Sequence, residues 1–269
     1  MTWILLYIMI GIMVLINFVL YAISNLSLPN RPNAVSGLHA ILSISSSIPF
    51  SLAILASFGA VMAVILMASS IGNEYNWRTL RIALISSEGR LKLLASKVIS
   101  VVILVIIGML INIAVGLVMS LITNSIAGNA LSFSFMTGGY LWDQFLQFWR
   151  TLFIILPFTL MGLMFAVVGR SAMPGIAVGI GILFLEPIIT ALMDVAGGWI
   201  SSVPKFLFAA NVNVIRALNN LPKGSGPFAG GATSANAPSL TQAYMVLGVY
   251  IIIFVAVAFY LFKKRDVTG

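Results

Sequence analysis

The sequence predicts an all-α, polytopic membrane protein with six transmembrane helices and a cytoplasmic amphipathic helix between the second and third. Hydrophobic residues make up 61% of the 269 residues and charged residues only 7%. The mean hydropathy is +1.12, whereas charged residues form about a quarter of a soluble domain. Apolar runs of about 20 residues also recur, and a helix of that length crosses the hydrocarbon core. We therefore expect a multi-pass protein of the cell membrane.

The apolar runs predict six spans within a single transmembrane domain, residues 1–269. The first run begins at Trp3 without a basic leader and is longer than a signal-peptide core, so we expect a retained helix. Only GRSAM separates spans four and five, which predicts an antiparallel hairpin. The spans are expected at about residues 3–23, 49–72, 98–123, 151–168, 174–193 and 243–262.

The segments between these runs are polar or rich in turn residues. Residues 24–48 begin SNLSLPNRPN, which predicts a loop that includes His39. Residues 124–150 place Trp142 and Trp149 like the interfacial aromatics of membrane proteins. The longest connection, 194–242, is expected to form short helices in WISSVPKFLFAANVNVIRALNN, followed by a flexible Gly/Pro/Ser/Ala-rich part.

Six spans place both termini on one side, and the basic residues indicate which side. Cytoplasmic loops carry an excess of Lys and Arg. With both termini cytoplasmic, the inner segments hold nine basic residues and the outer segments five. The inner set is Arg78, Arg81, Arg90, Lys92, Lys97, Arg170, Lys263, Lys264 and Arg265, and the outer set is Arg31, Arg150, Lys205, Arg216 and Lys223. We therefore expect cytoplasmic termini.

Residue types limit the chemistry of the chain. The sequence has no cysteine and a single histidine, His39, so it offers no thiol nucleophile and no histidine-based metal cluster. Walker-type GxxxxGK[ST] and HExxH motifs are also absent from the sequence. We expect no catalytic residues, no metal site and no cofactor bound by this chain, and any ATP chemistry must come from another chain. Nucleic acid is a poor partner for so apolar a protein.

Charge is concentrated in the segment 73–97, which contains EYNWRTLRIALISSEGRLK. Glu74 and Arg78 are four residues apart in the favourable order for a helical ion pair. Ser87 can cap a second helix with Glu88 in its first turn. The segment therefore predicts an amphipathic helix along the membrane, a turn, and a helix that rises into span three.

Two interpretations of this segment remain open. The basic residues alone are explained by an interfacial helix that obeys the positive-inside rule, because each contributes about 1 kcal/mol near anionic lipid. That interpretation does not predict two acids, a tryptophan and a turn in the same place. These features favour a surface that faces another protein.

The pattern E-Y-x-W-R-T-L-R, followed by S-x-x-G-R and a lysine that opens the next span, resembles the type-2 ABC transporter permease family. The closing FKKRDVTG, the six-span layout and the long loop before span six also resemble that family. The family begins with a cytoplasmic amphipathic helix, whereas this sequence begins MTWILLY inside an apolar run.

The resemblance implies the membrane subunit of an ATP-driven exporter, coupled to a separate ATPase subunit that binds ATP and Mg. It implies a second permease subunit, as a homodimer or a related chain, and alternating access for a hydrophobic or amphipathic substrate such as a lipid, drug or peptide. Residues 73–97 would be the coupling segment. Its ATPase-coupling residues would be Glu74, Tyr75, Trp77, Arg78, Arg81, Glu88 and Arg90.

Polar residues inside the spans are candidates for a translocation path or an interface. Glu186 and Pro187 lie in GILFLEPIIT, and an acid at mid-membrane costs on the order of 3 kcal/mol. Glu186 could face the path, paired with Arg150, or a water-accessible vestibule. Asn112 in span three could line the path or hydrogen-bond between helices. Gly175-x-x-x-Gly179 is a close-packing motif for a contact within the subunit or for a dimer seam.

Two other function classes are weighed against transport by an ABC permease. A membrane-embedded hydrolase needs a nucleophile and base or a metal cluster, for which the sequence has no residues in place. An ion-coupled secondary transporter would give Glu186 and Pro187 a role at a broken helix, but it would leave the E-Y-x-W-R-T-L-R element without one.

Overall fold

The computed structural model describes residues 2–24, 32–76, 89–127, 133–219 and 237–264. All regular structure in these residues is helical, with no strand among them, which confirms the predicted all-α class. Six described helices are long and apolar enough to cross a membrane. These are Trp3–Ser24, Ile44–Tyr75, Leu91–Ile126, Gly138–Gly169, Ala172–Ala196 and Leu240–Lys264.

Each expected span lies inside one of these helices, but several helices begin earlier than expected. The second is built from η1 (Ile44–Ser46), α3 (Ser47–Ile54), the π-helical turn η2 (Leu55–Gly59) and α4 (Ala60–Asn76). The third is α6 (Arg90–Ile126) and the fourth is α7 (Gly138–Gly169).

The expected loop at 24–48 is wrong in part. Residues Pro32–Leu42 form α2, and His39 is exposed on this helix rather than in a loop. Proline suits the first position of a helix because its missing N–H needs no partner there. The amphipathic helix expected within 73–97 falls on residues 77–88, which lie outside the described residues.

The chain divides into two compact units, which are described separately. Unit 1 comprises Met1–Gly59, Ile107–Leu152 and Ile215–Ala232. Unit 2 comprises Ala60–Ile106, Phe153–Val214 and Thr233–Gly269. Helices α6 and α7 each contribute residues to both units.

Unit 1 contains α1 (Thr2–Ser24), α2, α3, η2 and parts of α6 and α7. The carbonyl of Leu42, at the end of α2, accepts hydrogen bonds from Ser120 Oγ at 3.0 Å and Asn124 Nδ2 at 2.9 Å on α6. Tyr140 on α7 donates to the Ser45 carbonyl at 2.8 Å. These side chains satisfy backbone carbonyls that the short helices leave unbonded.

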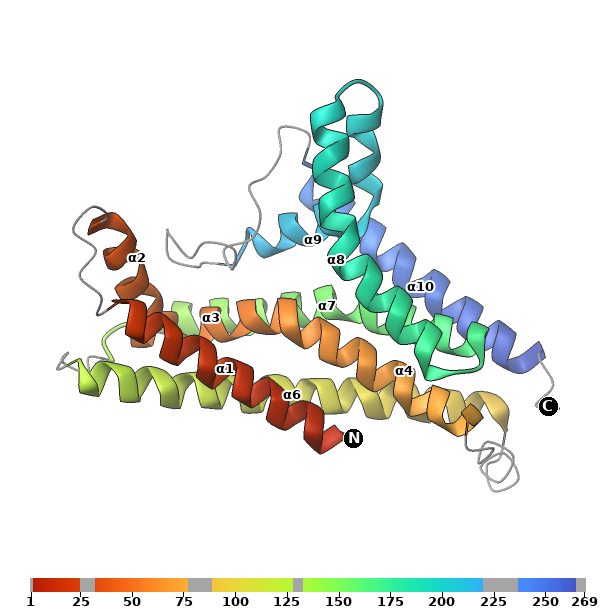
Figure 1. The fold of residues 1–269 in the computed structure, drawn as a ribbon, viewed down its shortest axis with the longest axis horizontal. Helices are drawn as coiled ribbons and strands as arrows, with labels where there is room; N and C mark the ends of the chain where they lie inside the picture. The colour runs from red at the N-terminus through yellow and green to blue at the C-terminus, as the bar shows by residue number, and fades with distance from the viewer. Residues whose placement is uncertain (1, 25–31, 77–88, 128–132, 220–236, 265–269) are drawn as a thin grey trace. The chain divides into compact units, whose positions relative to one another are not determined.

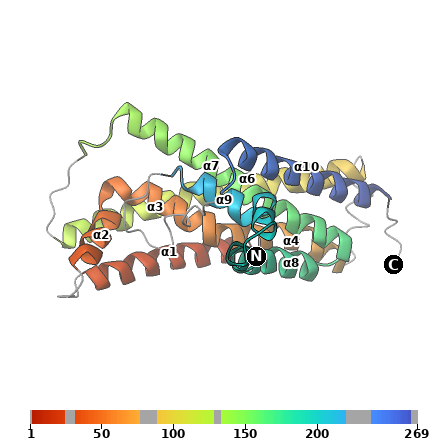
Figure 2. The ribbon, with the colours of Figure 1, turned by 90° about the horizontal axis from the view of Figure 1, so that it is seen from above.

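Unit 2 is organised around the contact between α4 and α8 (Ala172–Ala196), which lie side by side in Figures 1 and 2. A side chain at Gly175 would meet the Gly162 carbonyl of α7 and Ala68 of α4, and one at Gly179 would meet Val64 of α4. The Gly175-x-x-x-Gly179 motif therefore packs within the subunit, as one of its two interpretations predicted.

The segment after α8 forms short helices, as the sequence predicted. In Figure 1 the chain turns back from the end of α8, where η3 (Ile200–Phe206) packs on α8 and leads into α9 (Phe208–Arg216). Phe208 packs at a tilt against Phe158 of α7 and Tyr250 of α10 (Leu240–Lys264), with ring centroids 5.1 and 4.3 Å apart.

Candidate coupling site and buried polar groups

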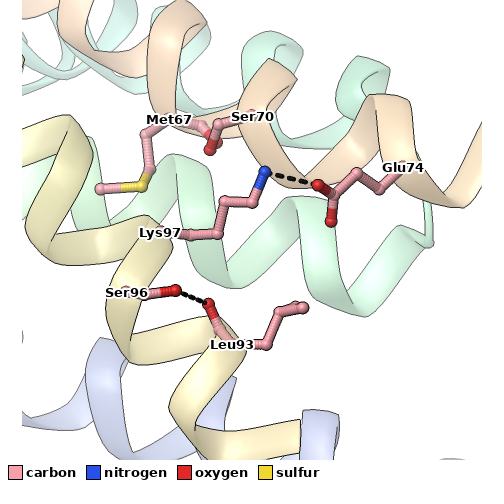
Figure 3. Close-up of polar contacts among 6 residues, drawn as sticks. All are labelled: Met67, Ser70, Glu74, Leu93, Ser96 and Lys97. Atoms are coloured by element: carbon pink, nitrogen blue, oxygen red, sulfur yellow. Dashed lines mark hydrogen bonds and ion pairs between the residues drawn. The ribbon is translucent and has the colours of Figure 1, made fainter. Parts of the chain in front are cut away.

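The end of α4 is joined to the first part of α6 by an ion pair. Glu74 Oε1 contacts Lys97 Nζ, and Figure 3 shows the two side chains pointing toward each other from the two helices. The Glu74 side chain is 18% exposed and the Lys97 side chain 34%. The pair is thus partly shielded from solvent, so it is screened less than a fully exposed pair. Glu74 Oε2 is buried and has no hydrogen-bond partner among the described residues.

Tyr75 makes a second connection from the same end of α4. Its ring meets Phe262 of α10 edge-on, with centroids 6.4 Å apart and planes at 80°. Edge-to-face aromatic pairs of this kind contribute about 0.5–1.5 kcal/mol beyond their buried area. Adjacent residues therefore tie one helix end to two different helices, α6 through Glu74 and α10 through Tyr75.

The remaining predicted coupling residues are not placed together by the structure. Arg90 is the first residue of α6, but its side chain lies outside the described part of the chain. The other four, Trp77, Arg78, Arg81 and Glu88, fall within 77–88 and lie outside the described residues. The structure therefore describes the two flanks of the predicted segment.

Glu186 is buried in α8, with 7% of its surface exposed. Its Oε1 accepts a hydrogen bond of 2.7 Å from the backbone N–H of Ala209, in the first turn of α9. Carboxylates are favoured at helix N-termini, where free N–H groups and the helix dipole meet. Arg150, the partner considered from the sequence, donates instead to the Leu218 carbonyl at 3.4 Å. Glu186 thus caps a neighbouring helix.

The other two residues expected on a path differ in exposure. Pro187 is exposed on α8, and its carbonyl accepts from Thr190 Oγ1 at 3.0 Å. Asn112 on α6 is 1% exposed, and neither end of its amide has a partner among the described residues.

Sequence reasoning did not anticipate that Arg216 on α9 is half-buried. Its guanidinium donates to the Ala56 carbonyl in the π-helical turn η2, and its Nε is buried without a partner among the described residues. Burial lowers the pKa of this guanidinium to about 10, so it stays protonated at neutral pH. The sequence showed Arg216 only as one of the basic residues of a long outer loop.

No group of three or more His, Cys, Asp or Glu side chains in the described part of the chain could hold a metal ion.

Comparisons with known proteins give a family but no activity. The chain matches the family described as "Protein of unknown function (DUF2705)" over residues 6–268. It is also similar to the "Uncharacterized protein YhcI" of Bacillus subtilis (strain 168), at 23% identity over 217 residues. The similar region covers 78% of this chain but 64% of that relative, so the chain spans less than two thirds of its length. No solved structure matches.

Proposed function

We propose that this chain, which belongs to the DUF2705 family, is the transmembrane permease subunit of an ATP-driven ABC exporter. The observation that carries the proposal is the Glu74–Lys97 ion pair at the two flanks of the segment 77–88. That segment continues the E-Y-x-W-R-T-L-R pattern, which resembles the coupling segment of type-2 ABC permeases.

The ion pair supports coupling because it joins the helices that enter and leave the segment. A partner that pushes on residues 77–88 acts on α4 and α6 together, since Glu74 and Lys97 oppose their separation. Tyr75 extends the connection to α10 through Phe262. On this proposal Arg78, Arg81, Glu88 and Arg90 supply the charged surface that meets the ATPase, with Trp77 as its apolar contact.

The proposed function implies the other parts of the transporter. The segment 77–88 and both termini would be cytoplasmic, the ATPase would bind ATP and Mg, and a second permease subunit would complete the path. The substrate would be hydrophobic or amphipathic, such as a lipid, drug or peptide. The ion-coupled alternative gains no support from Glu186, because that carboxylate is used to cap α9.

The test is co-purification of the tagged full-length chain from membranes of its own host, followed by mass spectrometry. We expect an ATP-binding-cassette ATPase to co-purify with the wild type, and Arg78→Glu to reduce its recovery at least about tenfold, because reversing a charge in an interface costs several kcal/mol. Lys205→Glu is the matched control, since it reverses a charge on η3 and should retain the ATPase. Loss of the ATPase from both variants, ATP hydrolysis by the chain alone, or transport driven by an ion gradient without ATP would refute the proposal.

A further inference from the structure

Unit 1 contains a row of buried polar side chains on α7. Gln144, Gln147 and Thr151 are 9%, 2% and 0% exposed. Their spacing of three and four residues places them on one face of the helix. Gln144 Oε1, both amide atoms of Gln147 and Thr151 Oγ1 have no hydrogen-bond partner among the described residues. Buried polar atoms of native proteins are nearly always bonded, to protein, water or ligand.

Arg150 adjoins this row on α7, and a hydrogen bond links it to the turn that follows Arg216. Arg150 is three residues from Gln147 on α7 and donates to the Leu218 carbonyl at 3.4 Å. Leu218 belongs to the turn that follows α9, in which Asn219 N donates to the Arg216 carbonyl at 2.9 Å. Asn219 is 7% exposed, and its Oδ1 also lacks a partner in the described part of the chain. The contact between Arg150 and the Leu218 carbonyl thus joins α7 to the turn that lies between Arg216 and Asn219 in the chain.

The charge of this region is not balanced within the unit. Asp143 is the one acid among the described residues of unit 1, and its side chain is exposed. Arg150 and Arg216 make their hydrogen bonds to backbone carbonyls. Ala56, which Arg216 contacts, lies twelve residues into the second span, about 18 Å from its start at 1.5 Å per residue. A half-buried cation at such depth is costly unless an anion accompanies it, and ionisable groups there usually mark a functional site.

We propose that Arg150, Arg216 and Gln147 bind the oxyanion headgroup, a phosphate or a carboxylate, of an amphipathic molecule. Guanidinium groups match both oxyanions in geometry, and the unpartnered Gln147 Nε2 supplies a further donor. The apolar walls expected of a membrane bundle would hold the tail. Naming this molecule as the exported substrate rests on the proposed function, whereas the binding itself does not.

The test is a binding titration on the purified full-length chain in a neutral detergent, without any ATPase. The ligands are dodecyl phosphate, dodecanoate and dodecanol, which share a tail and differ in headgroup, and phosphatidylglycerol is compared with phosphatidylcholine. Binding is followed by the rise in thermal unfolding temperature and by native mass spectrometry. We expect both dodecyl anions to bind at least about tenfold more tightly than dodecanol, because one charge-assisted hydrogen bond contributes enough free energy for that ratio. Saturation by phosphatidylglycerol that blocks the dodecyl anions would assign the site to a lipid headgroup.

Variants separate a ligand site from ordinary structure. Arg216→Gln and Arg150→Gln should each weaken anion binding at least about tenfold, and Lys205→Gln should leave it within about twofold. Gln147→Leu removes unpartnered buried atoms, so it should unfold at the same or a higher temperature and still lose anion affinity. If an arginine variant does not fold, Gln147→Leu still tests whether the row is part of an anion-binding site.

Several results would refute the proposed anion-binding site. They are equal binding of dodecanol, an equal loss in Lys205→Gln, or full anion affinity in a stabilised Gln147→Leu, which would mean that water alone occupies the row. None of these bears on ATPase recovery, so the two proposals can fail separately.

Discussion

Replacing Gly179 with alanine introduces one methyl group at the contact between α4 and α8. An ideal Cβ at this position overlaps Val64 Cγ1 and lies 3.4 Å from Val64 Cγ2. Either Val64 changes rotamer or the helices separate, and both lose packing contacts along the interface. Close approach at small residues is a main source of helix association in membranes, where no hydrophobic driving force acts between spans.

The expected free-energy change follows from two opposing effects. Alanine is favoured over glycine in a helix by about 1 kcal/mol, whereas overpacking a tight interface costs about 1–3 kcal/mol. We expect Gly179→Ala to lower the free energy of unfolding by on the order of 1 kcal/mol. Val64→Ala alone leaves a cavity and should cost on the order of 1–2 kcal/mol. The smaller alanine at position 64 makes room for the added methyl group at position 179. The double variant should therefore be about 1–2 kcal/mol more stable than the sum of the two single-variant losses would give.

The assay is equilibrium unfolding of the four proteins of this cycle in one detergent, followed by tryptophan fluorescence. Gly181→Ala is the matched control, because it lies on the same helix and its Cβ would meet nothing within 4 Å. That control should be neutral or stabilising by up to about 1 kcal/mol. Additive effects of Val64→Ala and Gly179→Ala, or equal destabilisation by Gly181→Ala, would refute this account of the interface.

Two further predictions concern the polar contacts of unit 2. Glu186→Ala leaves the Ala209 N–H without its acceptor and should lower the free energy of unfolding, measured by thermal unfolding, by about 1–3 kcal/mol. Glu186→Gln keeps an acceptor and should lower it less. Equal losses of stability in the two variants would exclude the capping role. Lys97→Glu places two acids side by side and should lower the free energy of unfolding by about 1 kcal/mol. Adding Glu74→Lys restores an ion pair of reversed order and should restore the free energy of unfolding. A double variant no more stable than Lys97→Glu would show that the ion pair contributes nothing.

Helix number and class could be predicted because they depend on hydropathy summed over about 20 residues. The start of α7 could not, since Asp143, Gln144, Gln147 and Arg150 interrupt the apolar run that marks a span. Two of these polar side chains are buried within the helix's packed face, and a hydropathy count reads them as a loop. Their burial depends on neighbours that are distant in sequence.

The candidate site was predictable only in part for the same reason. Glu186 was recognisable as an anomaly because an intramembrane acid is rare. Its partner, an N–H 23 residues away, carries no side-chain signal. Lys97 was recognisable as a basic residue that opens a span, but not as the partner of Glu74. The Gly175-x-x-x-Gly179 spacing predicted close packing, whereas the position of Val64 opposite Gly179 required the structure.

The glycines of α4 and α8 determine how movement would pass through unit 2. Gly72 lies against the backbone of Ala172 at the start of α8, so at this point two main chains meet with no side chain between them. Glu186, further along α8, bonds directly to the main chain of α9. Rotamer changes cannot absorb a displacement of α4 at the contact between Gly72 and Ala172, because no side chain lies there and tightly packed interiors yield little. A push at the Glu74 end would therefore travel as the sliding of whole helices toward α9, and truncating a single surface side chain would not interrupt it.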